Sequence, residues 1–241
     1  MVDPQLVAER EVEAGVHALA QQVPGQVLVA GHEHPGQAEL PFLVVEVRVV
    51  ERRLADEELS AYLLRQGLDA GFDLAFSNEL RIDHSITCPL ITLRPEADLP
   101  IVPIYTNIFA PPLPQPKRFV ELGRTIRQLV ESWPSDKRVA IIGTGHLSLE
   151  LGGPRQFGPH GPDPEFDRKA VGWIASGDLT SALAEVSLDS LWLPGNATHG
   201  FMDFMLMMGV AGENVKADYV DSLDLFHTME AYFTWYPEAS A

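Results

Sequence analysis

Short β-branched runs alternate along this chain with segments of helical periodicity, and this alternation constrains the fold more than any other feature. Apolar residues recur with helical spacing over residues 5–21, 54–71 and 119–133. The β-branched runs lie within residues 25–34, 41–50, 72–77, 99–107 and 138–145. Because buried strands that alternate with helices typically form a helix-covered sheet, we expect an α/β fold. It would be a single domain over residues 1–241 with a central, largely parallel or mixed sheet flanked by helices.

The charge balance narrows the classes of partner. The chain has 34 acidic and 17 basic side chains and a net charge of -17. Such a surface repels polyanions, so we expect neither a nucleic acid nor an anionic membrane as partner. Cys88 is the only cysteine, so it cannot form a disulfide within the chain. No apolar run is long enough to span a bilayer, and the first residues do not resemble a secretory leader; we therefore expect a cytoplasmic protein.

The end of the last β-branched run and the loop that follows it, "AIIGTGHLSLELGG", carry the densest set of candidate residues. A dinucleotide-binding turn would need a third glycine where Ser148 stands, and it would need an acidic residue after the next strand. A serine hydrolase would need Gly-x-Ser-x-Gly, but Ser148 lies in His-Leu-Ser-Leu-Glu. Neither chemistry fits this loop. The proline cluster at 109–118 is expected to be a loop before a helix rather than a binding motif.

Histidines stand at several of these element ends. His32 and His34 follow a predicted strand, which is where metal-binding side chains project from an α/β sheet. His84 and His199 lie in "RIDHSITCPL" and "GNATHGFMDF". Each of these histidines alone is more often a solvated or hydrogen-bonded structural residue than a ligand, so their order along the chain matters more than any single one.

Taken together, the segments resemble the class III extradiol ring-cleavage dioxygenases, the family of the protocatechuate 4,5-dioxygenase catalytic subunit. The stretches that carry the resemblance are "AGFDLAFSNELRIDHSITCPL", "LPIVPIYTNIFAPPLPQPKRFVELGRTIRQLVES", "VAIIGTGHLSLELGGPRQFG", "PEFDRKAVGWIASGD" and "GNATHGFMDFMLMMG". The resemblance implies Fe(II) held by two histidines and one glutamate, with positions open for a catecholate and O2. It also implies a histidine that acts as acid and base.

The resemblance assigns three site residues, and other positions of the family site lack the expected residue. It places His34 at the second iron ligand, and His84 and Thr87 beside the substrate. The position of the glutamate ligand falls on Gly200, directly after His199. Leu149 stands where the family has its acid and base histidine, and the family strand that carries the first iron ligand has no counterpart in the sequence. His146 appears three residues before Leu149, where relatives have a glycine, and His84 and His146 are the candidates for a catalytic role.

Three functions are compatible with this pattern, and we favour a non-catalytic, iron-free subunit of a heteromeric catechol or aminophenol dioxygenase. In that hypothesis the chain binds no cofactor and stabilises an intact catalytic relative, or it forms a homo-oligomer; 2-aminophenol 1,6-dioxygenase resembles such an assembly. The alternative is an active Fe(II) enzyme with rearranged ligands. Binding of a small aromatic ligand without turnover is a third candidate. The candidate replacement ligands of the active enzyme are His32, His34, His146, His160 and His199, with Glu33, Glu150 or Asp203.

The carboxy-terminal segment 217–237 carries much of the aromatic content of the chain, including Phe226, Phe233 and Trp235. A helix packed on the body of the domain is the simplest expectation for it. Aromatic residues are also enriched at subunit interfaces, so we expect this segment to contribute to a subunit contact.

Overall fold

The computed structural model describes residues 26–30, 43–47, 55–77, 82–96, 98–158, 161–225 and 228–236. The chain divides into two compact units. The first comprises residues 1–60 and 75–104, and the second comprises residues 61–74 and 105–241. The helix expected over residues 5–21 lies outside the described residues, and a single domain over residues 1–241 remains a prediction.

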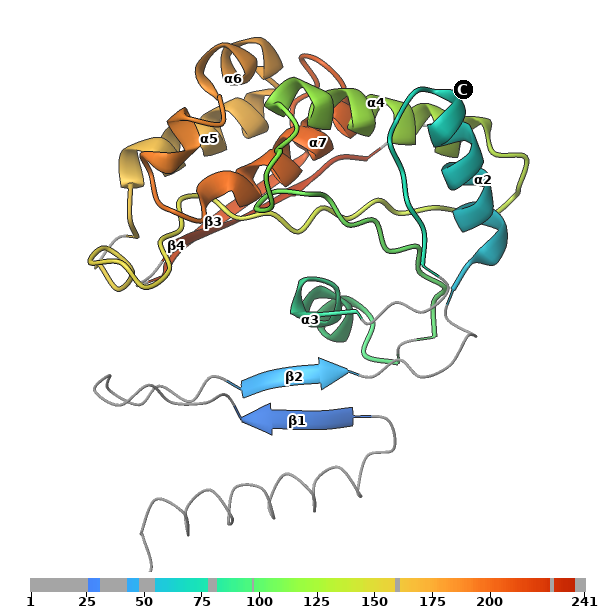
Figure 1. Cartoon of the computed structure of the whole chain (residues 1–241), viewed down its shortest axis with the longest axis horizontal. Coiled ribbons are helices and arrows are strands. Elements are labelled where there is room, and N and C mark those ends of the chain that lie inside the picture. Colours follow the sequence, from blue (N-terminus) through green and yellow to red (C-terminus); the bar gives the residue numbers. More distant parts are fainter. Residues whose placement is uncertain are drawn as a thin grey trace, which may run out of the picture. The chain divides into compact units, whose positions relative to one another are not determined.

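The described residues of the first unit include a two-stranded sheet and a helix that follows it in the sequence (Figure 1). Strands β1 (Gln26–Ala30) and β2 (Leu43–Val47) pair antiparallel, with Gln26 opposite Val47. Both strands fall within expected runs, so these two predictions are confirmed. Helix α3 (His84–Leu93) begins after Asp83, whose side chain accepts a hydrogen bond from the backbone N–H of Ser85. This is a standard N-cap, and it fixes where His84 enters the helix.

Helices dominate the rest of the chain. Helix α2 (Glu57–Asp69) confirms the helix expected over 54–71, and it crosses the boundary between the units. The second unit contains α4 (Pro116–Ser132), α5 (Pro164–Ser176), α6 (Leu179–Glu185) and α7 (Phe201–Ala211), together with the short 3-10 helices η2 (Ser190–Trp192) and η3 (Thr198–Gly200). Helix α4 confirms the helix expected over 119–133 and begins at a proline that ends the predicted proline loop.

Helices α4 and α7 pack backbone to backbone because each has a glycine at the contact. A Cβ added to Gly209 would lie 3.0 Å from the carbonyl carbon of Val120, and a Cβ on Gly123 would lie 3.0 Å from the backbone nitrogen of Val210. Neither neighbour can give way, since both belong to helix backbone. The close approach fixes α7 as the central helix of the second unit.

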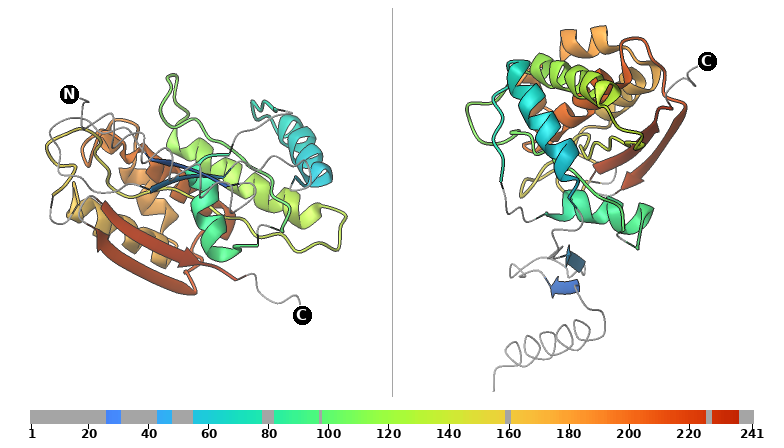
Figure 2. Two further views of the ribbon diagram at one scale, coloured as in Figure 1. Left: turned by 90° about the horizontal axis from the view of Figure 1, so that it is seen from below. Right: turned by 90° about the vertical axis from the view of Figure 1, so that its right-hand side faces the viewer.

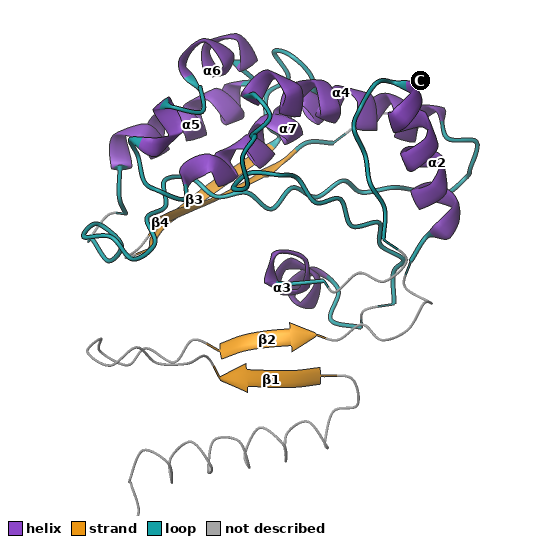
Figure 3. Cartoon of the chain, viewed as in Figure 1, coloured by secondary structure: helices purple, strands orange, loops and turns teal. Residues whose placement is uncertain are grey.

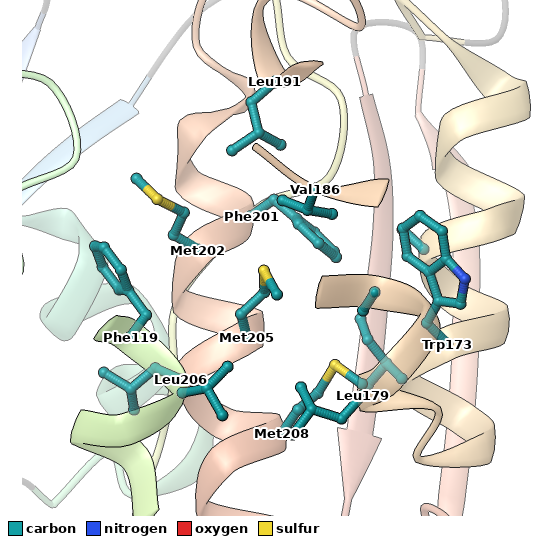
Figure 4. Packing of buried hydrophobic residues seen from close by; sticks show 14 of the residues in the cluster. Phe119, Trp173, Leu179, Val186, Leu191, Phe201, Met202, Met205, Leu206 and Met208 are labelled. Atoms are coloured by element: carbon teal, nitrogen blue, oxygen red, sulfur yellow. The ribbon is translucent and has the colours of Figure 1, made fainter. Parts of the chain in front are cut away.

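The core of the second unit surrounds α7, whose Phe201, Met202, Met205 and Met208 are almost fully buried (Figure 4). Residues of α4, α5 and α6 pack around them. The buried side chains labelled in Figure 4 from these neighbours include Phe119, Trp173 and Leu179. Burial of this kind is worth about 1.5–3 kcal/mol for each large apolar side chain, so α7 is rigidly held.

The carboxy-terminal segment is a β-hairpin, so the expected helix is wrong. Strands β3 (Tyr219–Leu225) and β4 (Thr228–Thr234) pair antiparallel with Tyr219 opposite Thr234. Every second residue from Met229 to Trp235 packs against the core, and the ring of Phe233 meets that of Phe204 edge-on. This period of two is the strand pattern. Figure 2 shows the hairpin lying along the helices of the second unit.

The expected central sheet is not found in the described part of the chain. Residues 72–77, 99–107 and 138–145 run as loops, apart from one parallel bridge between Ala55 and Ile101 (Figure 3). The two antiparallel pairs β1–β2 and β3–β4 are the sheets that the described residues form. A β-branched run favours an extended backbone, but it does not specify a hydrogen-bonding neighbour. No helix among the described residues has the length and apolarity needed to cross a membrane.

Candidate active site

The glycine-rich loop that follows residue 142 lies directly against the start of α7. A Cβ added to Gly145 would lie 2.5 Å from the carbonyl oxygen of Gly200, and a Cβ on Gly143 would lie 3.0 Å from the sulfur of Met207. A larger residue at either position would push the loop away from the helix. These glycines therefore allow the loop to pack closely against α7. This packing, rather than phosphate binding, accounts for the Gly-Thr-Gly sequence.

Ser148 anchors this loop to α5 through a buried carboxylate. Its backbone N–H donates to Oδ1 of Asp167 at 2.7 Å, and its hydroxyl donates to Oδ2 at 2.8 Å. The hydroxyl oxygen accepts from the backbone N–H of Asp163, and the carbonyl oxygen accepts from the hydroxyl of Thr228. Ser148 and Asp167 are both fully buried. The loop is thus tied to α5 and to β4 at the same residue.

Burial raises the pKa of Asp167 to about 6, and the two hydrogen bonds from Ser148 work against that rise. The negative charges of Asp163 and Asp224 add to the increase. A buried carboxylate with only neutral donors ionises reluctantly because water no longer solvates the charge. Sequence reasoning missed this residue, since an acid in the first turn of a helix normally lies in solvent.

The next residues of the loop pair with the segment before η3. The backbone N–H of Ala197 donates to the carbonyl of Leu149, and the amide side chain of Asn196 exchanges two hydrogen bonds of 2.8 Å with the backbone of Leu151. Glu150 is buried and forms an ion pair with Arg155 at 2.6 Å. Its carboxylate, one of the candidate ligands, is therefore already neutralised within the loop.

His146 lies with its ring against Gly200. A Cβ added to Gly200 would lie 2.5 Å from Nε2 of His146 and closer still to Cε1 and Nδ1. The imidazole therefore fills the volume that a side chain at residue 200 would need. The His146 side chain is half-buried, so part of it stays accessible. His146 and Gly200, both singled out in the sequence, are therefore in direct contact in the structure.

Asp203 lies in the first turn of α7, one turn beyond Gly200. A Cβ on Gly145 would lie 3.2 Å from the Cβ of Asp203, so this side chain adjoins the same loop. Its Oδ1 accepts a 2.7 Å hydrogen bond from the hydroxyl of Thr106, and burial raises the pKa of the carboxyl while that hydrogen bond lowers it. Thr106 was missed by sequence reasoning because 97 residues separate it from its partner.

His199 is adjacent to Gly200 in the chain, but its ring is held elsewhere. The side chain is almost fully buried, its Nε2 lies 3.0 Å from the carbonyl oxygen of Leu188, and its ring meets Trp192 edge-on. Because a carbonyl can only accept, Nε2 carries the proton and donates it, which leaves Nδ1 as an acceptor without a partner among the described residues. These contacts fit a structural histidine that fixes the start of η3.

His84 and Thr87 both lie on α3, three residues apart, so they share one face of that helix. The side chain of His84 is exposed and that of Thr87 is buried. Of the remaining candidates, His32, Glu33, His34 and His160 lie outside the described residues. Their roles, like those of His84 and Thr87, remain predictions.

Iron(II) in a facial triad takes two imidazoles and one carboxylate. Within the described ranges, no three His, Cys, Asp or Glu side chains come together as a metal site. The junction of the loop with α7 offers one imidazole, His146, and one carboxylate, Asp203. An imidazole and a carboxylate are donor types that Fe(II) takes in proteins.

Several known proteins are similar to this chain in sequence. Gallate dioxygenase from Pseudomonas putida is 28% identical over 150 residues, which are 60% of this chain and 42% of that protein. The 2,3-dihydroxyphenylpropionate/2,3-dihydroxicinnamic acid 1,2-dioxygenase from Xanthobacter autotrophicus is 30% identical over 166 residues, which are 63% of this chain and 51% of that enzyme. The chain thus matches about half of the length of these relatives.

A family model described as the catalytic LigB subunit of aromatic ring-opening dioxygenase matches residues 47–234. This match corrects the expectation of a chain without a cofactor, because the family is that of the catalytic subunit, for which the resemblance implies Fe(II), and the relatives carry the names of dioxygenases. The site must therefore be considered with iron. The match covers most of the chain, including the loop around His146 and the start of α7, and the chain belongs to the LigB family of aromatic ring-opening dioxygenases.

Proposed function

We propose that this chain is an Fe(II)-dependent aromatic ring-opening dioxygenase with rearranged site residues. The observation that carries the proposal is the match of residues 47–234 to the catalytic subunit of such enzymes. The second support is that an imidazole, His146, and a carboxylate, Asp203, both adjoin the place where the glycine loop meets α7. Fe(II), when bound, would supply coordination positions for the diol and for O2.

The substrate class proposed here is a benzene ring with two neighbouring hydroxyl groups. One relative is named for gallate and the others for 2,3-dihydroxyphenylpropionate, and both compounds carry such a pair. The two hydroxyl oxygens must lose protons before they can act as strong anionic ligands. His146 is suited to accept one of these protons, since an imidazole exchanges protons near neutral pH.

The surrounding residues hold this imidazole in place. Ser148, two residues after His146, is fixed by three hydrogen bonds to Asp163 and Asp167. Gly145, directly before His146, contacts the backbone of Gly200. Because both sides of His146 are anchored, its ring needs little reorganisation to meet a substrate, and such preorganisation lowers the barrier of the chemical step.

The test is anaerobic reconstitution with Fe(II), removal of free metal, and measurement of iron per chain and of O2 uptake. Gallate and 2,3-dihydroxyphenylpropionate are the substrates, and hydroquinone, whose hydroxyls are not neighbours, is the control. We expect about one iron per chain and O2 uptake with the two vicinal diols alone. Absence of both retained iron and O2 uptake would refute the proposed function.

A second experiment addresses the substrate side. We propose that His84 and Thr87 contact the aromatic substrate, as the resemblance implies. The variant His84→Gln is expected to raise KM with the iron content unchanged, because it removes a substrate contact and no iron ligand. Cys88→Ser is a matched control, since Cys88 is exposed on the same helix. An unchanged KM in His84→Gln would contradict this assignment.

A further inference from the structure

Strand β3 is the outer strand of the carboxy-terminal hairpin, and one of its edges is open. Within the described ranges it pairs with β4 alone. All of its residues from Tyr219 to Asp224 are exposed, whereas β4 places alternate side chains such as Phe233 against the core. Both faces of β3 and one edge are therefore accessible. A free edge of this kind is the part of a sheet to which another extended segment can pair.

The backbone groups at this edge are directed away from β4. The N–H of Ser222 donates to Oδ1 of its neighbour Asp221 at 2.9 Å, so it takes no part in the pairing with β4. Successive N–H groups of a strand point to opposite edges, so those of Val220 and Asp224 face the open edge as well. The edge thus offers backbone donors at alternate residues, which is the spacing that an added strand requires.

Two carboxylates on β3 have no cation beside them in the described part of the chain. Asp221 lies on the face away from the core, opposite the exposed ring of Tyr232, and Asp224 lies on the other face. Neither forms an ion pair with a described Lys or Arg, whereas Glu185 of α6 pairs with Lys169 of α5. Because complementary charge favours one partner over another, these carboxylates select a basic segment for the open edge.

The same charges disfavour a second copy of this chain at the edge. The chain has a net charge of -17, and pairing of β3 with β3 of another copy would bring the same carboxylates together. Like charges at neighbouring positions of a strand pair are destabilising. A basic segment would instead gain from both carboxylates.

Exposed apolar side chains on β3 alternate with the charges and define the rest of the complementary pattern. Leu223 lies on the same face as Asp221, and Val220 lies on the same face as Asp224. An added antiparallel strand would place a basic residue opposite each carboxylate and an apolar residue opposite Val220 and Leu223. The matching segment has two basic residues three positions apart, each followed by an apolar residue.

We propose that the open edge of β3 binds an extended basic segment of a partner protein, which adds to the hairpin as a third, antiparallel strand. The backbone groups of the edge supply the hydrogen bonds, and Asp221 and Asp224 supply the selectivity. This inference goes beyond the proposed function, because it involves neither iron nor the glycine loop. It also gives the subunit contact expected for this segment a defined edge and a defined chemistry.

The probe is the acetylated and amidated peptide Ile-Lys-Val-Thr-Lys-Val-Tyr, whose lysines would lie opposite Asp224 and Asp221 and whose threonine would lie opposite Ser222. Calorimetric titration of the full chain measures its affinity, and hydrogen exchange locates it. We expect one peptide per chain and slower exchange at the N–H groups of Val220 and Asp224. A control peptide with proline in place of threonine has the same charge but lacks the central donor, and it should bind at least about fivefold more weakly.

Variants of the chain test the charges and the edge separately. Asp221→Asn/Asp224→Asn removes both charges at nearly constant shape and should weaken binding of the first peptide by about 2–30-fold, with a smaller dependence on salt. Asp136→Asn/Asp189→Asn is the matched control, since both carboxylates are exposed elsewhere in the second unit, and it should leave the affinity unchanged. Ser222→Pro removes an edge donor without removing a bond to β4, so it should weaken binding while the far-UV circular dichroism stays that of the wild type.

Several outcomes would overturn the inference. Absence of saturable binding would do so, and so would equal affinity for the two peptides, because attraction by net charge alone does not distinguish them. Unchanged affinity in Asp221→Asn/Asp224→Asn would show that these carboxylates do not select the partner. Self-association of the wild type in light scattering that is lost in Ser222→Pro would make a second copy the occupant. None of these readouts depends on iron content or O2 uptake, so a failure here leaves the proposed function standing.

Discussion

Asp167 makes the stability of the protein depend on pH in a direction opposite to that of an ordinary surface carboxylate. Burial raises its pKa from 3.8 to about 6 in the folded chain. The folded state therefore favours the protonated acid more than the unfolded state does. The resulting stabilisation is fully present below pH 3.8 and is lost as the pH rises through 6.

The size of the effect follows from the shift. A displacement of about two pKa units corresponds to about 3 kcal/mol between the two protonation states, since one unit is worth about 1.4 kcal/mol. Asp167→Asn keeps the shape and removes the ionisation. The free energy of unfolding of the wild type minus that of Asp167→Asn should therefore fall by about 3 kcal/mol between pH 3 and pH 7.5.

Urea unfolding at four or five pH values measures this difference, and the titration of all other groups cancels in it. Asp178 is the matched control, because its half-buried carboxyl has a lowered pKa owing to hydrogen bonds from Ser181. Its stabilisation is present above pH 3.8 and lost as the pH falls, so the corresponding difference for Asp178→Asn should have the opposite sign. A wild-type minus Asp167→Asn difference that does not change with pH would refute the reasoning.

Two further substitutions test the packing around α7. Thr106→Val removes the hydroxyl that donates to Asp203, which should raise the carboxyl pKa further and destabilise the fold by about 1 kcal/mol; an unchanged Asp203 titration by NMR would contradict this. Gly209→Ala places a methyl group 3.0 Å from the carbonyl carbon of Val120 and should cost about 1–3 kcal/mol in urea unfolding. Gly172→Ala, on the open face of α5, should instead stabilise by about 0.5–1 kcal/mol, and equal effects of the two would contradict the helix contact.

Local features of the fold could be predicted from the sequence, because local patterns cause them. Apolar spacing predicted α2 and α4, since apolar residues three and four positions apart form one face of a helix. The proline cluster correctly predicted a loop before α4. The carboxy-terminal hairpin was not predicted although Met229, Ala231 and Phe233 alternate, because a high aromatic content is compatible with a packed helix as well as with a strand.

Long-range arrangement could not be predicted in the same way. The expected central sheet is not confirmed, because three β-branched runs are loops in the described part of the chain, and a β-branched run does not specify which segment pairs with it. For the site, the sequence identified His146 and Asp203 as candidates and revealed that residue 200 has no side chain. The order of these motifs was also enough to identify the family.

The tertiary structure alone decided how these residues act on one another. The His146 ring occupies the space above Gly200, and Thr106 reaches Asp203 across 97 residues of chain. The buried pair of Ser148 and Asp167 likewise joins a loop to a helix. Contacts of this kind depend on how far two backbones approach, and only the packing of the core fixes that distance.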